Sequence, residues 1–348
     1  MNFSTTKINR RNILAMSAAG SAGLLLGTRP LASLGAVAKD LSRVELRVAR
    51  NRFFPANLSD LWERAGVGNF PYKIKYAEFL TTASAVEAMN ADALDVGLAS
   101  EPAAAFASAS GAQVKLISSG RLDDNAQAIL IPSGSPIKTI SDLRGKRVCY
   151  VRAVSSHYIL LKVLEKNNLS WSDVKPVPLS PADGQAAFLS GYVDAWVMYG
   201  HAIPFNVMTY GAKVLSYGKG YESGFQMTIA NPLAIADPLR REALADYLIR
   251  VRHGYAWANA NPREYAKLWS DISGVKYDVI LRLVENASGP LEILPITPDA
   301  QSALQEVADT FTKAGELKSR ANTLPIWDLT FDKVLKNPDT LQPVIKRS

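Results

Sequence analysis

Residues 142–166 read DLRGKRVCYVRAVSSHYILLKVLEK, a stretch that contains a complete strand–turn–helix unit. Residues 148–151 form an apolar run that predicts a buried strand. Ser155 and Ser156 then precede a predicted helix with an apolar face, and its opposite face carries Lys162, Glu165 and Lys166. A buried strand followed by an amphipathic helix is the repeating unit of a mostly parallel α/β sheet.

The same unit recurs on both sides of this stretch. Alternating apolar side chains predict half-buried strands over residues 44–48 and 72–76, with a helical stretch near 58–65 between them. Further strands are predicted at 94–98, 114–117, 177–179 and 195–198, and further helices from Ser84, over 101–109 and over about 182–190. From about Pro238 the pattern becomes helical, and one helix is expected to open at Thr297-Pro298 and to close at Gly315.

Composition narrows the class of protein. A length of 348 residues suits one large α/β protein or two lobes, and 48% hydrophobic with 20% charged residues is typical of a folded chain. Residues 1–38 hold four basic residues and no acid, so the rest of the chain has 35 Lys and Arg against 32 Asp and Glu. This small excess of positive charge excludes a nucleic-acid-binding surface. One cysteine and three widely separated histidines give no metal-binding pattern, and we expect no metal or other cofactor.

The N-terminal segment has the pattern of a bacterial export signal. Arg10-Arg11 precede an apolar run over residues 15–27, and Ala36-Val37-Ala38 provides small residues for signal-peptidase cleavage. The paired arginines favour the twin-arginine route, and an ordinary Sec signal is the alternative. We therefore expect residues 1–38 to be removed and the mature protein to be soluble and periplasmic.

The sequence lacks the motifs of common catalytic sites. It has no phosphate-binding loop, dinucleotide fingerprint, zinc-protease helix or nucleophile elbow. Cys149 lies within an apolar strand, which favours an inert buried thiol over a nucleophile. We therefore expect a protein that is not an enzyme, with no catalytic residues.

Anion binding needs only backbone amides and hydroxyls at helix N-termini. Four strand-to-helix junctions carry suitable residues, at Asn57 to Ser59, Thr81-Thr82, Ser100-Glu101 and Ser155 to His157. Each by itself is most simply a helix cap. In parallel α/β sheets, however, such junctions lie at the carboxyl edge of the sheet, where ligands bind. The sequence therefore predicts a cleft at this edge.

Several motifs also carry a family resemblance. They are the segments DLRGKRV at 142–148, SSHY at 155–158, LSPADGQAAF at 179–188, GYVDAW at 191–196, EAMNA at 87–91 and LDVG at 94–97. Together they resemble the periplasmic substrate-binding proteins of ABC importers for aliphatic sulfonates, taurine and nitrate. The likeness runs across nearly the whole mature chain and is strongest over residues 127–199.

The resemblance implies a periplasmic-binding-protein type II fold, with two α/β lobes joined by two crossover strands at residues 127–132 and about 226–231. Residues 39–127 and 231–348 would form the first lobe, and residues 128–230 the second. The implied function is an exported receptor that captures a small organosulfonate or related anion between the lobes. It would act as a monomer and deliver the ligand to an ABC permease and ATPase.

The resemblance also implies which residues face the ligand: Phe54, Asn57, Thr81, Thr82, Ser100, Glu101, Asn125, Ser155, Ser156, His157 and Tyr199. The hydroxyl pairs at 81–82 and 155–156 would hold the oxyanion from opposite lobes. Phe54 and Tyr199 would pack on the organic part of the ligand.

Two departures from the family pattern leave the ligand class open. The sulfonate binders tend to read Trp-Asp-Pro where this chain has Tyr199-Gly200-His201, and Gly-Ser-Ser where it has Ala153-Val154-Ser155. One alternative is a receptor of the same fold for a pyrimidine or another aromatic or neutral compound. A second is a desulfinase-like enzyme, whose chemistry in the family relative depends on a cysteine in the cleft.

Overall fold

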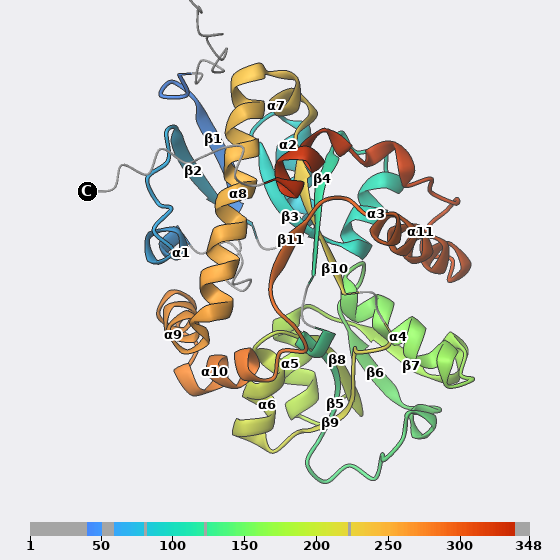
Figure 1. Cartoon of the computed structure of the whole chain (residues 1–348). Coiled ribbons are helices and arrows are strands. Elements are labelled where there is room, and N and C mark those ends of the chain that lie inside the picture. The colour runs from blue at the N-terminus through green and yellow to red at the C-terminus, as the bar shows by residue number, and fades with distance from the viewer. Residues whose placement is uncertain (1–39, 51–58, 80–81, 122–123, 222–223, 338–348) are drawn as a thin grey trace, which may run out of the picture. The chain divides into compact units, whose positions relative to one another are not determined.

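The computed structural model describes residues 40–50, 59–79, 82–121, 124–221 and 224–337 (Figure 1). The predicted export signal and three predicted ligand residues, Phe54, Asn57 and Thr81, lie outside these ranges. The described residues form two sheets with helices packed on them, as the alternating sequence pattern predicts. Both sheets are mixed, whereas that pattern predicted a mostly parallel sheet, because β5 and β10 run antiparallel to their neighbours.

The first sheet has six strands in the order β11-β4-β10-β3-β1-β2. Its strands are β1 (Glu45–Arg50), β2 (Lys73–Glu78), β3 (Val96–Ser100), β4 (Lys115–Arg121), β10 (Phe225–Ala230) and β11 (Glu292–Leu294). β1 pairs in parallel with β2 and β3. The connecting helices are α1 (Ser59–Arg64), α2 (Thr82–Asn90) and α3 (Glu101–Ala109).

The second sheet has five strands in the order β7-β6-β8-β5-β9. Its strands are β5 (Gln127–Ile131), β6 (Arg147–Tyr150), β7 (Lys175–Pro178), β8 (Ala195–Tyr199) and β9 (Lys213–Tyr217). β6 is parallel to β7 and β8. The helices of this sheet are α4 (Ser155–Lys166), α5 (Pro181–Leu189) and α6 (Ala202–Tyr210).

The C-terminal part is helical, as predicted. Its helices are α7 (Pro232–Ala236), α8 (Pro238–Ala260), α9 (Pro262–Ser273), α10 (Tyr277–Glu285), α11 (Pro298–Lys313) and α12 (Asp332–Lys336). At the predicted start of α11 the Thr297 hydroxyl accepts a hydrogen bond from the Ala300 amide at 3.2 Å. Phe311 of α11 packs against Phe106 of α3, with the ring centroids 5.0 Å apart.

Strand direction decides where the first connection between the sheets runs. β10 is antiparallel to both β3 and β4, so β4 runs in the direction of β3 and ends at the same edge. β5 is antiparallel to β8, so β5 begins at the edge where β8 ends. Residues 122–126, between β4 and β5, therefore join the carboxyl edge of one sheet to the carboxyl edge of the other.

The return connection, residues 218–224, joins the same two edges. β9 is antiparallel to β5 and so ends where β8 ends, and β10 begins where β3 ends. The predicted lobe division counts residues 225–230 with the second lobe, whereas β10 pairs on both sides within the six-stranded sheet. The two carboxyl edges, the usual place for a ligand in an α/β sheet, are thus tied together twice.

Two helices begin differently from the prediction. α2 begins at Thr82, two residues before the predicted Ser84. In α4, Val154 occupies the N-cap position without a side-chain cap, so Ser155 and Ser156 are helical residues and not caps. The preceding Ala153 has a φ of 60°, a left-handed conformation that turns the chain, and the helix begins one residue earlier than it would with Ser155 as its cap.

Helix α8 approaches α1 closely at Gly254. A Cβ atom at this position would lie 2.6 Å from Cζ3 of Trp62 and 3.2 Å from Cδ2 of Leu61. Trp62 is 1% exposed, and its Nε1 donates a hydrogen bond to the Tyr76 hydroxyl at 2.9 Å. The ring therefore has little freedom to move away.

We predict that Gly254→Ala lowers the free energy of unfolding by about 1–2 kcal/mol. Overpacking against the ring costs up to about 3 kcal/mol, and alanine returns roughly 1 kcal/mol in helix propensity. Urea denaturation measures the change. Gly289→Ala is the control, because no atom lies within 4 Å of a Cβ at that exposed glycine. Equal stability of Gly254→Ala and the wild type would contradict the close packing.

Candidate functional site

The carboxyl edge of the six-stranded sheet holds two predicted ligand residues. Ser100 ends β3, and Gln226 of β10 is its Cα partner. Glu101 begins α3 and is 3% exposed, at the helix end where the dipole favours an acidic side chain. On the other side of β10, Arg121 ends β4 and its guanidinium lies 4.2 Å from the ring centroid of Phe225. This edge therefore combines an acid, a cation, a hydroxyl and an amide.

The carboxyl edge of the five-stranded sheet holds Tyr199 at the end of β8. Its Cα partner is Gln127, the first residue of β5. The amide of Gly200 donates to the Ala126 carbonyl at 2.6 Å. This hydrogen bond links the turn after β8 to the connection between β4 and β5, which is called the first crossover below. Burial raises the pKa of Tyr199, whose ring packs partly buried in the apolar cluster on the α5 and α6 side of the sheet.

Three hydroxyl groups at these edges make no hydrogen bond to any described residue. They belong to Thr82 at the start of α2, Ser100 at the start of α3 and Ser155 at the start of α4, and all three residues are half-buried. By contrast, Ser118 in the interior of the six-stranded sheet donates to Thr228 at 2.7 Å. A sheltered hydroxyl without a protein partner is a donor and acceptor that a ligand can use.

Ser156 differs from its neighbour Ser155. It is fully buried, its Oγ accepts from the Val151 amide at 3.2 Å, and the same oxygen lies 3.2 Å from the Val151 carbonyl, to which it can donate. These bonds close the turn between β6 and α4. Its described contacts therefore give Ser156 a structural role, and its contact with a ligand stays a prediction.

His157 lies in the first turn of α4 and is 0% exposed. Its ring packs among aromatic side chains, with centroid distances of 4.6 Å to Tyr150, 5.4 Å to Trp171 and 5.0 Å to Phe311. Nδ1 accepts from the Ala153 amide at 3.4 Å, and Nε2 lies 4.0 Å from Oε1 of Glu316. Burial lowers the pKa of His157 to about 4, against the attraction of the Glu316 carboxylate. The imidazole is therefore neutral at pH 7.

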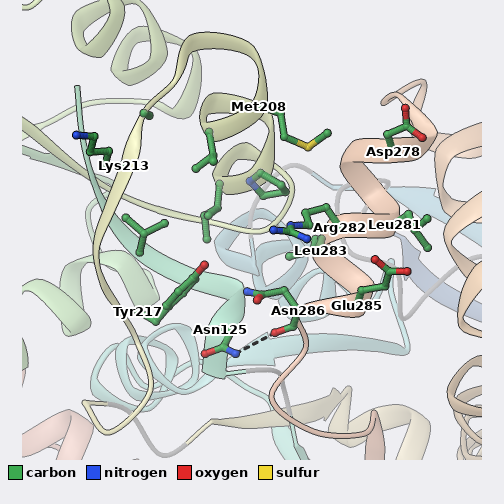
Figure 2. Close-up of a pocket in the computed structure, with 15 residues that line it drawn as sticks. Asn125, Met208, Lys213, Tyr217, Asp278, Leu281, Arg282, Leu283, Glu285 and Asn286 are labelled. Carbon is green, nitrogen blue, oxygen red and sulfur yellow. Dashed lines mark hydrogen bonds between the residues drawn. The ribbon is translucent and has the colours of Figure 1, made fainter. Parts of the chain in front are cut away.

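Asn125 lies in the short 3₁₀ turn Asp124–Ala126 of the first crossover. Its side-chain amide donates to the Asn286 carbonyl at 2.9 Å, just after α10 (Figure 2). Asn125 also lines a pocket of about 580 Å³ between α6, β9 and α10. The structure thus places Asn125 beside a cavity that could not be predicted from the sequence.

Sequence reasoning also missed Gln226. This glutamine is 7% exposed, and its amide makes no hydrogen bond to the described part of the chain. It is the only amide side chain in β10, whose residues are all buried. A lone glutamine in a buried apolar strand is the signal that could have identified it, because buried polar groups normally have a partner.

The charged groups near the edges are mostly paired. Arg50 and Glu78, at the ends of β1 and β2, form an ion pair at 2.8 Å, and Arg152 pairs with Glu316 at 2.7 Å.

Burial raises the pKa of Cys149 to about 12, so this thiol is no nucleophile at neutral pH. No three His, Cys, Asp or Glu side chains of the described ranges are grouped to hold a metal ion. Within those ranges, no helix is long and apolar enough to span a membrane.

Comparison with known proteins supports the predicted family. A model of the family described as NMT1/THI5 like matches residues 73–265. A protein of Escherichia coli (strain K12) named for the binding of aliphatic sulfonates is 30% identical over 246 residues, which are 69% of this chain and 74% of that protein.

Solved structures confirm the predicted fold class. The alkanesulfonate-binding protein SsuA of Xanthomonas axonopodis pv. citri, bound to MOPS, has 25% identity and a TM-score of 0.74, covering 82% of this chain and 99% of its own. The periplasmic aliphatic sulphonate binding protein SsuA of Escherichia coli also has 25% identity and a TM-score of 0.74, covering 83% and 94%. The desulfurization enzyme DSZB has 15% identity and a TM-score of 0.61, covering 85% and 99%, and shares the fold alone.

The buried imidazole of His157 leads to a pH-dependent stability. An unfolded histidine takes up a proton near pH 6.5, whereas His157 in the folded protein does so only near pH 4. Between these values the unfolded chain binds more protons, so the free energy of unfolding falls as the pH drops, by up to about 3 kcal/mol. His157→Phe, which suits the aromatic surroundings, should make the stability less dependent on pH over this range.

Urea denaturation at intervals from pH 7 to pH 4 measures this difference. His253→Phe changes an exposed histidine of α8 and is the matched control, with a curve expected to run parallel to that of the wild type. A parallel curve for His157→Phe as well would show that His157 contributes no such pH dependence.

Proposed function

Because the chain belongs to the NMT1/THI5-like family, we propose that it is the solute-binding receptor of an ABC importer and captures a small organosulfonate, aliphatic or aryl, or a related anion. The observation that carries the proposal is the set of half-buried hydroxyls at Thr82, Ser100 and Ser155, which have no partner within the described residues. They stand at the starts of helices on both sheets, whose carboxyl edges the two crossovers join.

The chemistry of a sulfonate suits these donors. One negative charge is spread over three oxygens, so several weak donors can share it without a full counter-charge. Helix N-termini offer free backbone amides and the positive end of the helix dipole. Thr82 from one lobe and Ser155 from the other would bind oxygens of the same group and so favour closure around the ligand.

The remaining assignments follow from this role. We propose that the chain is exported, loses residues 1–38 and works in the periplasm as a monomer that delivers its ligand to a permease and ATPase. The signal-like pattern with Arg10-Arg11 and the names of the related proteins support this location. The role requires no cofactor and no nucleic acid.

An enzymatic role of the desulfinase type would need an accessible cysteine as the nucleophile, and the described residues contain none. Cys149, the single cysteine, is 0% exposed within β6, and burial raises its pKa to about 12. We therefore propose a binding function without chemistry.

A ligand screen tests the receptor. Ligands that bind only the folded chain raise its melting temperature. We expect stabilisation by alkyl or aryl sulfonates and none by chloride at the same ionic strength. A panel of sulfonates, taurine, nitrate, sulfate and a pyrimidine distinguishes the ligand classes, and stabilisation by the pyrimidine alone would replace the sulfonate with an aromatic ligand.

Alanine substitutions test the anion site. Ser155→Ala and Thr82→Ala each remove one donor from a sheltered site, so each should weaken binding about five- to 150-fold, or about 1–3 kcal/mol. Ser302→Ala, at an exposed position of α11, is the control and should leave affinity unchanged. Calorimetric titration with the best sulfonate of the screen measures all three. Unchanged affinity in both site variants would mean that the anion binds elsewhere.

A further inference from the structure

The pocket between α6, β9 and α10 has the size and lining of a site for an apolar group (Figure 2). Its volume of about 580 Å³ falls within the usual range for pockets that bind small organic molecules. Apolar side chains from all three elements line it, including Ile203, Val207, Met208, Val214, Leu281 and Leu283.

The apolar lining is partly uncovered. Met208 is 51% exposed and Val207 is 38% exposed, although both are large apolar residues. Methionine adapts its shape to different partners, because it is unbranched and flexible. An apolar group in the pocket would remove this surface from water.

The charges around the pocket balance. Lys213 and Arg282 are basic, Asp278 and Glu285 are acidic, and all four are exposed. A rim with two positive and two negative groups has no net attraction for an anion. The pocket itself is therefore suited to an uncharged part of a ligand.

The pocket begins at the same sheet edge as the proposed anion site. Ile203 and Pro204, in the first turn of α6, lie a few residues after Tyr199, and Tyr217 ends β9 beside β5. The Ile203 amide donates to the Gly200 carbonyl at 3.1 Å, and the Gly200 amide donates to Ala126. Asn125, a predicted ligand residue, lines the pocket at this end.

We propose that this pocket accepts the apolar tail of the organosulfonate whose anionic group is held at the sheet edges. The inference rests on the proposed function and narrows its ligand class. The preferred ligands are sulfonates with an extended alkyl chain or an aryl group, in preference to methanesulfonate or taurine.

A series of linear alkanesulfonates from one to eight carbons tests the proposal by calorimetric titration. Each methylene buried in the pocket should tighten binding about two- to fourfold, so octanesulfonate should bind far more tightly than ethanesulfonate. Equal affinity along the series would overturn the tail pocket and leave the receptor intact. Absence of binding by any sulfonate would overturn both.

Two variants locate the tail. Val207→Trp fills the pocket with a larger side chain, and Met208→Asp places a charge in its lining. Each should weaken octanesulfonate binding at least tenfold and change ethanesulfonate binding less than twofold. Leu189→Trp, at an exposed position of α5 outside the lining, is the matched control and should change neither. Chain-length dependence that survives in both pocket variants would overturn the proposed location, and thermal melting checks that each variant is folded.

Discussion

Strand direction at the two crossovers is the constraint on which the site depends. β5 and β10 each run antiparallel to the parallel strands of their own sheet. Because of this reversal, both short connections leave one carboxyl edge and enter the other. Helix N-termini follow the carboxyl ends of parallel strands. The helix N-termini of both sheets therefore lie at the edges that the two connections join. If β5 or β10 ran in the opposite direction, its connection would join different edges. The helix N-termini of one sheet would then lie away from those of the other.

Most polar contacts between α4 and α11 are ion pairs that contribute little free energy. Lys162 pairs with Glu306 at 2.9 Å and Glu165 pairs with Lys313 at 2.9 Å, with most of these side chains exposed. Exposed ion pairs contribute about 0–1 kcal/mol each and are screened by salt. The apolar contact of Phe311 with Tyr158 is the more durable part of this interface. The interface between α4 and α11 thus combines exposed ion pairs of low energy with an apolar contact.

The sequence predicted most strands and helices, because period-two and helical patterns are local. The range of α3 and the Thr297 cap of α11 are as predicted. The start of α4 was not predicted correctly, because it depends on the left-handed backbone conformation of Ala153, which is unusual for alanine. Gln226 and the tail pocket were missed for a different reason. They depend on pairing and packing between elements that are distant in the chain, as when α10 packs on α6.

The electrostatics of the site favour a singly charged, weakly hydrated anion. Burial lowers the pKa values of His157 and His201, so neither supplies a positive charge at pH 7. Arg50 and Arg152 are each held by a carboxylate. Buried Glu101 adds a carboxylate at the edge of the six-stranded sheet. Apart from Arg121 at the edge of the six-stranded sheet, attraction for an anion must then come from hydroxyls and helix N-termini, whose partial charges compensate about one charge. A doubly charged anion would lose more hydration than these donors replace, whereas a sulfonate matches them and leaves its organic group for an apolar pocket.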